Sequence, residues 1–168
     1  MVGGRSGVAA KIHCGWPEGA RTWAVPSAAI VKRFSLVPLG GSPVGAASAL
    51  KMSYAGITKG TTAIASAMLL GAARFGCAEA LIAELSESQP QMLARMRSGI
   101  PGMYDKAYRW VAEMEEISDF LNENPPSRDI YAAIARLYDY LAAAHAEARP
   151  GADNAVRTLD RVLGRTSG

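Results

Sequence analysis

The chain contains few of the residues on which most metal and catalytic sites depend. Its 168 residues include two cysteines, Cys14 and Cys77, and two histidines, His13 and His145. The cysteines lie far apart and form no CxxC or Cys/His cluster, which argues against a structural zinc site and favours a reducing, cytoplasmic environment. His13 lies in a glycine-rich segment, and His145 lies near a predicted helix end, where it suits the helix dipole. A Ser-His-Asp triad is therefore not expected.

Phosphate-binding loops are missing as well. The sequence contains neither GxGxxG nor GxxxxGK[ST], the glycine-rich patterns whose backbone amides cradle nucleotide phosphates. The chain therefore has no phosphate-cradling loop of its own.

Acidic residues are absent from a long stretch, since none lies between Glu18 and Glu79. Residues 1–78 hold eight Lys/Arg and one acid, whereas residues 79–168 hold ten Lys/Arg and fourteen acids. A basic half can indicate nucleic acid or an anionic small molecule. Because these basic residues are scattered and not interleaved with aromatic residues, we expect no nucleic-acid partner.

No apolar run is long and pure enough to suggest a membrane span. Met52 to Ala73 is the nearest candidate, but it carries Lys59, three glycines and several Ser and Thr residues, and it lacks interfacial Trp. We expect a core or interface helix there and no membrane contact. Met1 to Ala10 has no apolar core of the secretory type.

The first 41 residues differ in character from the rest. Residues 1–20 are rich in glycine and show no period, which predicts a loose arm. Residues 21–41 contain RTWAV, SAAIVKRF and SLVPL, which predict a short strand, helix and strand. A helix is then expected from Ser42, with Pro43 in its first turn, to about Phe75. Its glycines cost about 1 kcal/mol each on an exposed helix, so we expect a buried helix with other backbones close to it.

The second half is helical throughout. Helices are predicted over Cys77–Ser86, Gln89–Arg97 and Met103–Asn122, then after the Asn124–Ser127 turn, and finally through Leu163 with Asp153 as its cap. Two of these segments carry apolar stripes at spacings of three and four, formed by Met103, Ala107, Trp110, Val111, Met114, Ile117 and Leu121 and by Ile130, Ile134, Leu137, Leu141 and Ala144.

Carboxylates on the first of these helices are expected to be solvated. Glu113, Glu115 and Glu116 spread over its outer side, and Arg109 lies four residues before Glu113, a spacing that allows an ion pair on the helix surface. We do not expect acid/base chemistry from this group.

Lys51 is the residue that most needs an explanation, because it is a lone charge among small and apolar residues. Tyr54 lies one turn after it and Ser48 about one turn before it, so both can form hydrogen bonds with it. A lysine buried among apolar groups is typical of bases and hydrogen-bond donors in active sites. The alternative is a structural lysine whose stem packs on the protein while its ammonium group reaches solvent.

Two stretches resemble a known superfamily. GAASALKMSYAGITKG, Gly45 to Gly60, resembles the start of the long helix in the C-terminal domain of β-hydroxyacid and 6-phosphogluconate dehydrogenases, where a glycine-rich turn leads into a helix with the catalytic lysine. KAYRWVAEMEEI, Lys106 to Ile117, resembles the family's helix that begins with a lysine near the cofactor. The likeness is closest to the helical C-terminal domain of unknown function in bacterial 6-phosphogluconate dehydrogenase-like proteins, over about residues 20–145.

The resemblance implies a mainly α fold of the 6-phosphogluconate dehydrogenase C-terminal type over residues 42–168, with one long central helix. Residues 21–41 would be the α/β remnant of a Rossmann domain. It further implies NAD or NADP as cofactor, a hydroxy-acid substrate, no metal, and a homodimer formed through the long helix. The implied site residues are Lys51 for catalysis, Ser48, Tyr54 and Ala55 for substrate binding, and Lys106 for cofactor binding.

The sequence also departs from this family. Tyr54-Ala55 stands where 6-phosphogluconate dehydrogenases have His-Asn, and Thr58 stands where they carry an acidic glutamate. We therefore expect a hydroxy acid other than 6-phosphogluconate, with Tyr54 supplying a hydrogen bond. The chain begins about where the Rossmann domain would end, which predicts that it is inactive alone. A truncated or frame-shifted reading frame is one hypothesis for its origin, and a natural product is the other.

Two other functions stay open. A free-standing helical dimerisation or interaction module would bind no cofactor, and its Lys51 would be structural. Membrane attachment through Met52–Ala73 would bring the protein down with membranes.

Overall fold

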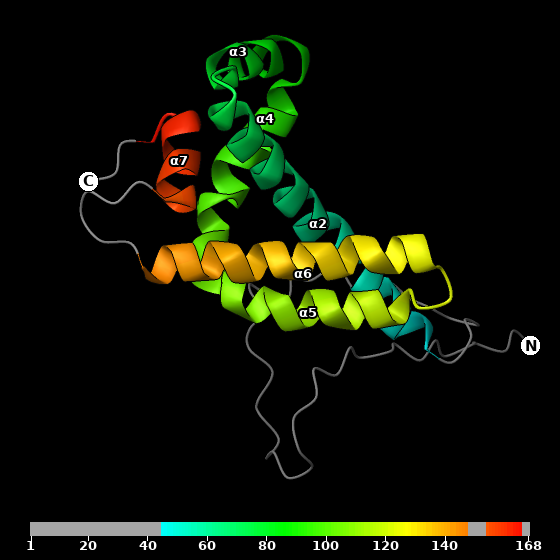
Figure 1. The fold of residues 1–168 in the computed structure, drawn as a ribbon. Coiled ribbons are helices and arrows are strands. Elements are labelled where there is room, and N and C mark those ends of the chain that lie inside the picture. The colour runs from blue at the N-terminus through cyan, green and yellow to red at the C-terminus, as the bar shows by residue number, and fades with distance from the viewer. Residues whose placement is uncertain (1–44, 148–153, 166–168) are drawn as a thin grey trace, which may run out of the picture. The chain divides into compact units, whose positions relative to one another are not determined.

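The computed structural model describes residues 45–147 and 154–165. The predicted arm at 1–20 and the strand-helix-strand at 21–41 lie outside these residues. Within them the chain forms only helices, which confirms the predicted mainly α class. The elements are α2 (Ala46–Arg74), α3 (Ala78–Ser88), α4 (Pro90–Gly99), the 3₁₀-helix η1 (Pro101–Lys106), α5 (Ala107–Phe120), α6 (Pro125–Ala146) and α7 (Ala155–Val162) (Figure 1).

Contacts divide the chain into two units, Met1–Lys51 and Met52–Gly168. The described residues of the first unit are 45–51, which include the first turn of α2. The described residues of the second unit form the rest of α2 and all the later helices.

The helix starts follow local signals in the sequence. Asn124 caps α6, where its side chain accepts a hydrogen bond from Ser127 N, and two prolines follow it at the start of the helix. Asn154 caps α7 in the same way and accepts from Arg157 N. The predicted cap, Asp153, lies outside the described residues.

No loop separates α4 from α5 at residues 99–102, because η1 continues the chain in helical form. Pro101 has no N–H with which to continue the hydrogen bonds of α4, and Met103 N donates to Ile100 O at 3.1 Å, across three residues. The chain therefore tightens into η1 before α5 begins. The helix predicted from Met103 begins as this 3₁₀ turn and becomes α-helical at Ala107.

The α5 and α6 helices form an antiparallel pair and lie side by side (Figure 1). Their facing sides carry most of the predicted apolar stripes. Ile130 is an exception, since 52% of it is exposed; the next residue, Tyr131, makes the contact with α2 instead. The stripe residues that are buried are Met103, Ala107, Met114, Ile117, Ile134, Leu141 and Ala144.

Two glycines of α2 receive a side chain from α6. A Cβ placed on Gly56 would lie 2.9 Å from Tyr131 Oη, and one on Gly60 would lie 3.5 Å from the same atom. The expectation of closely packed neighbours is confirmed here, but the neighbour is an aromatic ring and not another backbone. At Gly71 a Cβ would meet nothing within 4 Å, so that glycine has no packing role within the described residues.

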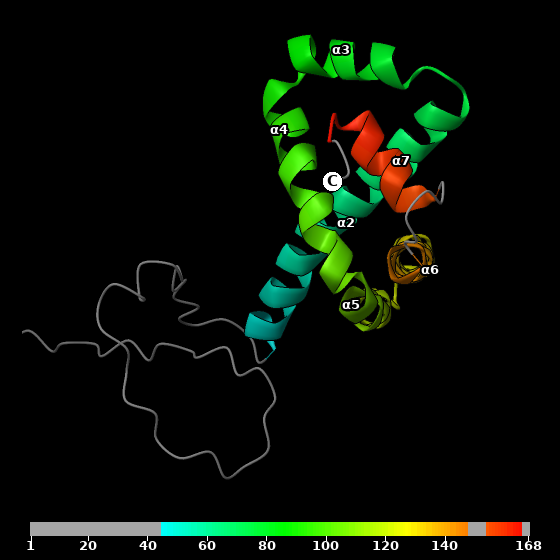
Figure 2. The same ribbon diagram turned by 90° about the vertical axis from the view of Figure 1, so that its left-hand side faces the viewer.

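The remaining helices surround the C-terminal half of α2. In Figure 2, α3 joins the far ends of α2 and α4. The α7 helix packs against α3 and α6, and it is tied to η1 by Tyr104, whose hydroxyl donates to Asp160 Oδ1 at 3.2 Å. The core therefore continues from the α5–α6 pair into α7, where Val156 and Leu159 are buried.

Substitution of Gly56 tests the contact with Tyr131. Gly56→Leu should lower the free energy of unfolding by about 1–3 kcal/mol, the usual cost of overpacking, although leucine is a better helix former than glycine. In a Tyr131→Ala background the same change should cost little or should stabilise. Urea unfolding of the four proteins, at one protein concentration, measures the difference; an equal loss in both backgrounds would refute the contact.

Alkaline pH tests the buried hydroxyls of Tyr138 and Tyr104. Burial raises the pKa of Tyr138. The pKa of Tyr104 is raised mainly by burial and further by the nearby Asp160 carboxylate. Folding favours the neutral hydroxyls. Their contribution to the free energy of unfolding is therefore complete below about pH 10, the usual pKa of unfolded tyrosine. It is lost as the pH rises towards the pKa values of the two tyrosines in the folded state. The free energy of unfolding should fall above about pH 10.

Tyr138→Phe is the matching variant. It should cost about 1 kcal/mol at neutral pH through loss of one hydrogen bond and should make the alkaline fall shallower. Chemical unfolding at pH 8 to 11 is the measurement, and an unchanged slope would contradict the role of Tyr138.

Candidate functional site

The residues predicted for the substrate site lie in the N-terminal turns of α2. Lys51 and Ser48 are exposed, Tyr54 is 70% exposed, and Ala55 is half-buried against the core. Among the described residues, no hydrogen bond or ion pair of Lys51 is found. Lys51 is thus exposed in the described part of the chain, as in the alternative of a lysine whose ammonium group reaches solvent, and its catalytic role stays a prediction.

Lys106 lies at a different place in the fold. It is exposed and ends η1, where it occupies the N-cap position of α5. No contact joins it to Tyr54 or Ala55 among the described residues of the second unit. The structure thus leaves Lys106 accessible to a ligand.

A second lysine of α2 forms the centre of a polar contact that the sequence did not indicate. Lys59 forms an ion pair with Glu113, and its Nζ lies 5.0 Å from the centroid of the Trp110 ring. Its side chain is 20% exposed. The predicted surface pair between Arg109 and Glu113 is replaced by this pair, because α2 brings Lys59 to that side of α5. The other two carboxylates of the predicted group, Glu115 and Glu116, are exposed as expected.

The backbone of Lys59 is held as well. Tyr138 Oη donates to Lys59 O at 2.5 Å, and the Tyr138 ring meets Trp110 edge to face at 5.3 Å between centroids. Since that carbonyl also belongs to α2, the contact joins α2, α5 and α6 at one point. Lys59 is thus a structural lysine.

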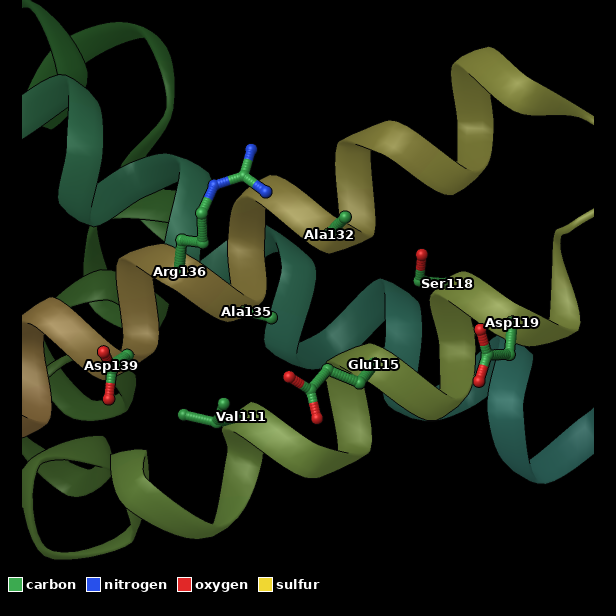
Figure 3. Close-up of a pocket in the computed structure, with 8 residues that line it drawn as sticks. All are labelled: Val111, Glu115, Ser118, Asp119, Ala132, Ala135, Arg136 and Asp139. Atoms are coloured by element: carbon green, nitrogen blue, oxygen red, sulfur yellow. The ribbon is translucent and has the colours of Figure 1, made fainter.

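A pocket of about 500 Å³ lies between α5 and α6 (Figure 3). Its polar side chains come from both helices: Glu115 and Asp119 from α5, and Arg136 and Asp139 from α6. Ser118, also on its wall, uses its hydroxyl to donate to Arg128 O at 3.0 Å. Within residues 45–147 and 154–165, no group of three His, Cys, Asp or Glu is placed to hold a metal ion. The pocket therefore lacks a focused set of ligands.

Another depression, of about 360 Å³, is almost wholly apolar. We call it the methionine groove. It is formed by α2, α3 and α4, and its lining includes Ile64, Met68, Leu81, Leu85, Met92 and Met96.

His145 has a partner that the sequence did not predict. It lies in the last turn of α6, as expected, with its Nε2 3.0 Å from Asp105 Oδ1 and its ring stacked on Tyr104 at 5.7 Å. Its Nδ1 is buried, and the described residues offer it no hydrogen-bond partner. The contacts attach the end of α6 to η1, and they place no second reactive group beside the ring.

One family model matches part of the chain. Residues 72–141 match the family model described as Domain of unknown function (DUF1932), a segment that runs from the end of α2 to Leu141 of α6. No curated protein and no solved structure matches the chain. Lys106 falls inside the matched segment, whereas Ser48, Lys51, Tyr54 and Ala55 precede it.

A helix that crosses a membrane must be long and apolar enough to span the hydrocarbon core of the bilayer. None of the helices in the described part of the chain is both long and apolar enough to cross one.

Paired substitutions separate the two lysines of α2. Lys59→Met should lower the free energy of unfolding by about 1 kcal/mol, because it removes a charge-assisted hydrogen bond to a partly exposed partner. Lys51→Met should change it by less than about 0.5 kcal/mol, as is usual for exposed residues. Urea unfolding monitored by Trp fluorescence measures both. A larger loss for Lys51 than for Lys59 would reverse the assignment.

Proposed function

We propose that the chain is the helical substrate-binding and dimerisation domain of an NAD(P)-dependent hydroxyacid dehydrogenase similar to 6-phosphogluconate dehydrogenase. The observation that carries the proposal is the open position of Lys51 on α2. A cation that adds little to the fold, in a stretch that resembles a catalytic motif, is available for a substrate. The family match over residues 72–141 agrees with the helical part of the resemblance but does not bear on the reaction.

In this proposal Lys51 acts on the substrate hydroxyl. Its Nζ, as the neutral amine, accepts the proton of the substrate hydroxyl and becomes an ammonium group. A bound nicotinamide cofactor would supply the hydride acceptor for the hydrogen on the same carbon, and the keto acid would be the product. The hydroxyls of Ser48 and Tyr54 and the backbone at Ala55 orient the substrate. Lys106 offers a positive charge to the cofactor.

The described residues fit only part of this task. They contain no strand followed by a glycine-rich turn and a helix, which is the unit that normally holds a dinucleotide. Binding of NAD or NADP would therefore require a nucleotide-binding domain beside this one. The hydroxyl of Thr58 donates to Tyr54 O at 2.9 Å, and it cannot replace a carboxylic acid. Oxidation without acid-assisted decarboxylation is the chemistry that these residues suit.

A free-standing dimerisation module is the second candidate. It is favoured by the apolar side chains exposed along α2, of which Tyr54, Ile57 and Met68 are each more than 60% exposed. Such a surface on a helix is typical of a protein–protein contact. This function needs neither Lys51 nor a cofactor, so the two candidates differ in what Lys51 does.

Kinetics of the lysine variant test the catalytic part. In a full-length dehydrogenase that carries this helical domain, replacing the lysine that matches Lys51 by alanine should lower kcat by about 10²–10⁴, the range usual for acid–base groups. Replacing the lysine that matches Lys59 by methionine is the control and should lower kcat only through stability. NAD(P)H formation at 340 nm is the measurement. A loss of less than a few-fold for the Lys51 position would leave the dimerisation module as the function.

A further inference from the structure

The pocket between α5 and α6 is separate from the residues of the proposed dehydrogenase site. Its lining contains none of the residues proposed to act on substrate or cofactor, and none of the side chains that meet Lys59. Its volume of about 500 Å³ lies within the range usual for small-molecule sites, about 300–1,000 Å³. The pocket can therefore hold a ligand of its own.

The apolar part of the lining is made of short side chains. Val111 comes from α5, and Ala132 and Ala135 come from α6. Ala135 is buried, whereas Val111 and Ala132 are half-buried. Because these side chains are short, they leave room between the two helices. Their apolar surface suits the methylene groups of a ligand better than its charged groups.

The charged part of the lining consists of Glu115, Asp119, Arg136 and Asp139. None of these four side chains forms an ion pair or hydrogen bond with any residue that the structure describes. Arg136 and Asp139 are three residues apart on α6, a spacing at which helix side chains can pair. In Figure 3 their side chains point in different directions instead. Charges of both signs are therefore available to a ligand.

A buried oxygen on the wall of the pocket has capacity to accept a further hydrogen bond. Ser118 is 7% exposed, and its hydroxyl donates its hydrogen to Arg128 O at 3.0 Å. A serine hydroxyl can also accept two hydrogen bonds, and no donor among the described residues reaches this one. Because buried polar atoms are normally satisfied, the Ser118 oxygen points to a ligand that carries an N–H group.

We propose that this pocket binds a basic α-amino acid, a molecule with two ammonium groups and one carboxylate. Arg136 pairs with the carboxylate of the ligand. Glu115 and Asp139 receive its α-ammonium group. Asp119 and the Ser118 oxygen receive the ammonium group at the end of its side chain. The methylene groups between the two ends lie on the apolar part of the lining.

The signs and the spacing of the charges fit such a ligand. The wall carries three carboxylates and one guanidinium group, so a complementary molecule carries more positive than negative groups. Glu115 and Asp119 are one turn apart, about 6 Å along the helix axis, and the two amines of a lysine-length molecule can span a similar distance. Asp139 and Asp119 lie at opposite ends of the labelled group in Figure 3. Separated carboxylates of this kind suit two ammonium groups better than one metal ion.

Three related compounds test the class of ligand on the full chain. L-Lysine carries all three charged groups, 1,5-diaminopentane lacks the carboxylate, and L-norleucine lacks the terminal ammonium group. L-Lysine should bind about threefold more tightly than either of the other two, or better, because each of them lacks one charge contact. Isothermal titration calorimetry at low ionic strength, where exposed charges are least screened, measures the three dissociation constants.

Variants assign the individual contacts. Arg136→Gln should raise the dissociation constant of L-lysine about threefold or more and should not raise that of 1,5-diaminopentane. Asp119→Asn should weaken the binding of L-lysine by a similar factor and leave that of L-norleucine unchanged. Glu116→Gln is the control, because it removes the same charge from an exposed residue of α5 outside the lining, and it should have little effect. Far-UV circular dichroism confirms that each variant is folded.

Three outcomes would overturn the inference. The first is that none of the three compounds gives a heat of binding. The second is an equal effect of Glu116→Gln and Asp119→Asn, which would mean that the general charge of the surface attracts the ligand. The third is tighter binding of 1,5-diaminopentane than of L-lysine, with no effect of Arg136→Gln, which would mean that the pocket takes a diamine. None of these results depends on Lys51 or on a nicotinamide cofactor, so they leave the proposed dehydrogenase function to its own kinetic test.

Discussion

The hydrogen bond from Tyr138 Oη to the carbonyl of Lys59 sets where the α5–α6 pair meets α2. A helix carbonyl normally accepts from its own helix, so this second donor pins α6 to one turn of α2. Trp110 meets the same tyrosine edge to face, and Glu113, one turn further along α5, takes the Lys59 ammonium. Three helices are thereby fixed in rotation as well as position. The glycines at 56 and 60 then follow as a requirement, because Tyr131 lies on them.

This junction also decides which side of α2 is left open. The buried residues of α2 include Gly56 and Gly60, which lie against Tyr131 of α6. Further along, Leu69 is buried on the side of α2 that meets α3 and α4. The side that remains carries large apolar residues and no acid. A surface of this kind costs free energy in water unless it is covered.

The two lysines of α2 illustrate how similar residues acquire different roles. Lys59 is enclosed by Glu113 and Trp110 and contributes to the junction. Lys51 is exposed, and the described residues offer it no hydrogen bond or ion pair. In the proposed dehydrogenase, the substrate supplies the partner of Lys51. The same helix would then serve the fold with one lysine and the chemistry with the other.

The sequence alone determined the local features of the fold. Apolar spacing predicted α5 and α6, and turn residues such as Asn124 with its two prolines placed their limits to within a few residues, because these signals depend on nearby positions. It also singled out Lys51 by its isolation. Only the tertiary structure decided that Lys51 is exposed, that Glu113 pairs with Lys59 in place of Arg109, and that Ile130 faces out while Tyr131 packs inward. Those outcomes depend on which face of α2 meets α5 and α6, a contact between residues more than fifty positions apart that helix periodicity does not specify.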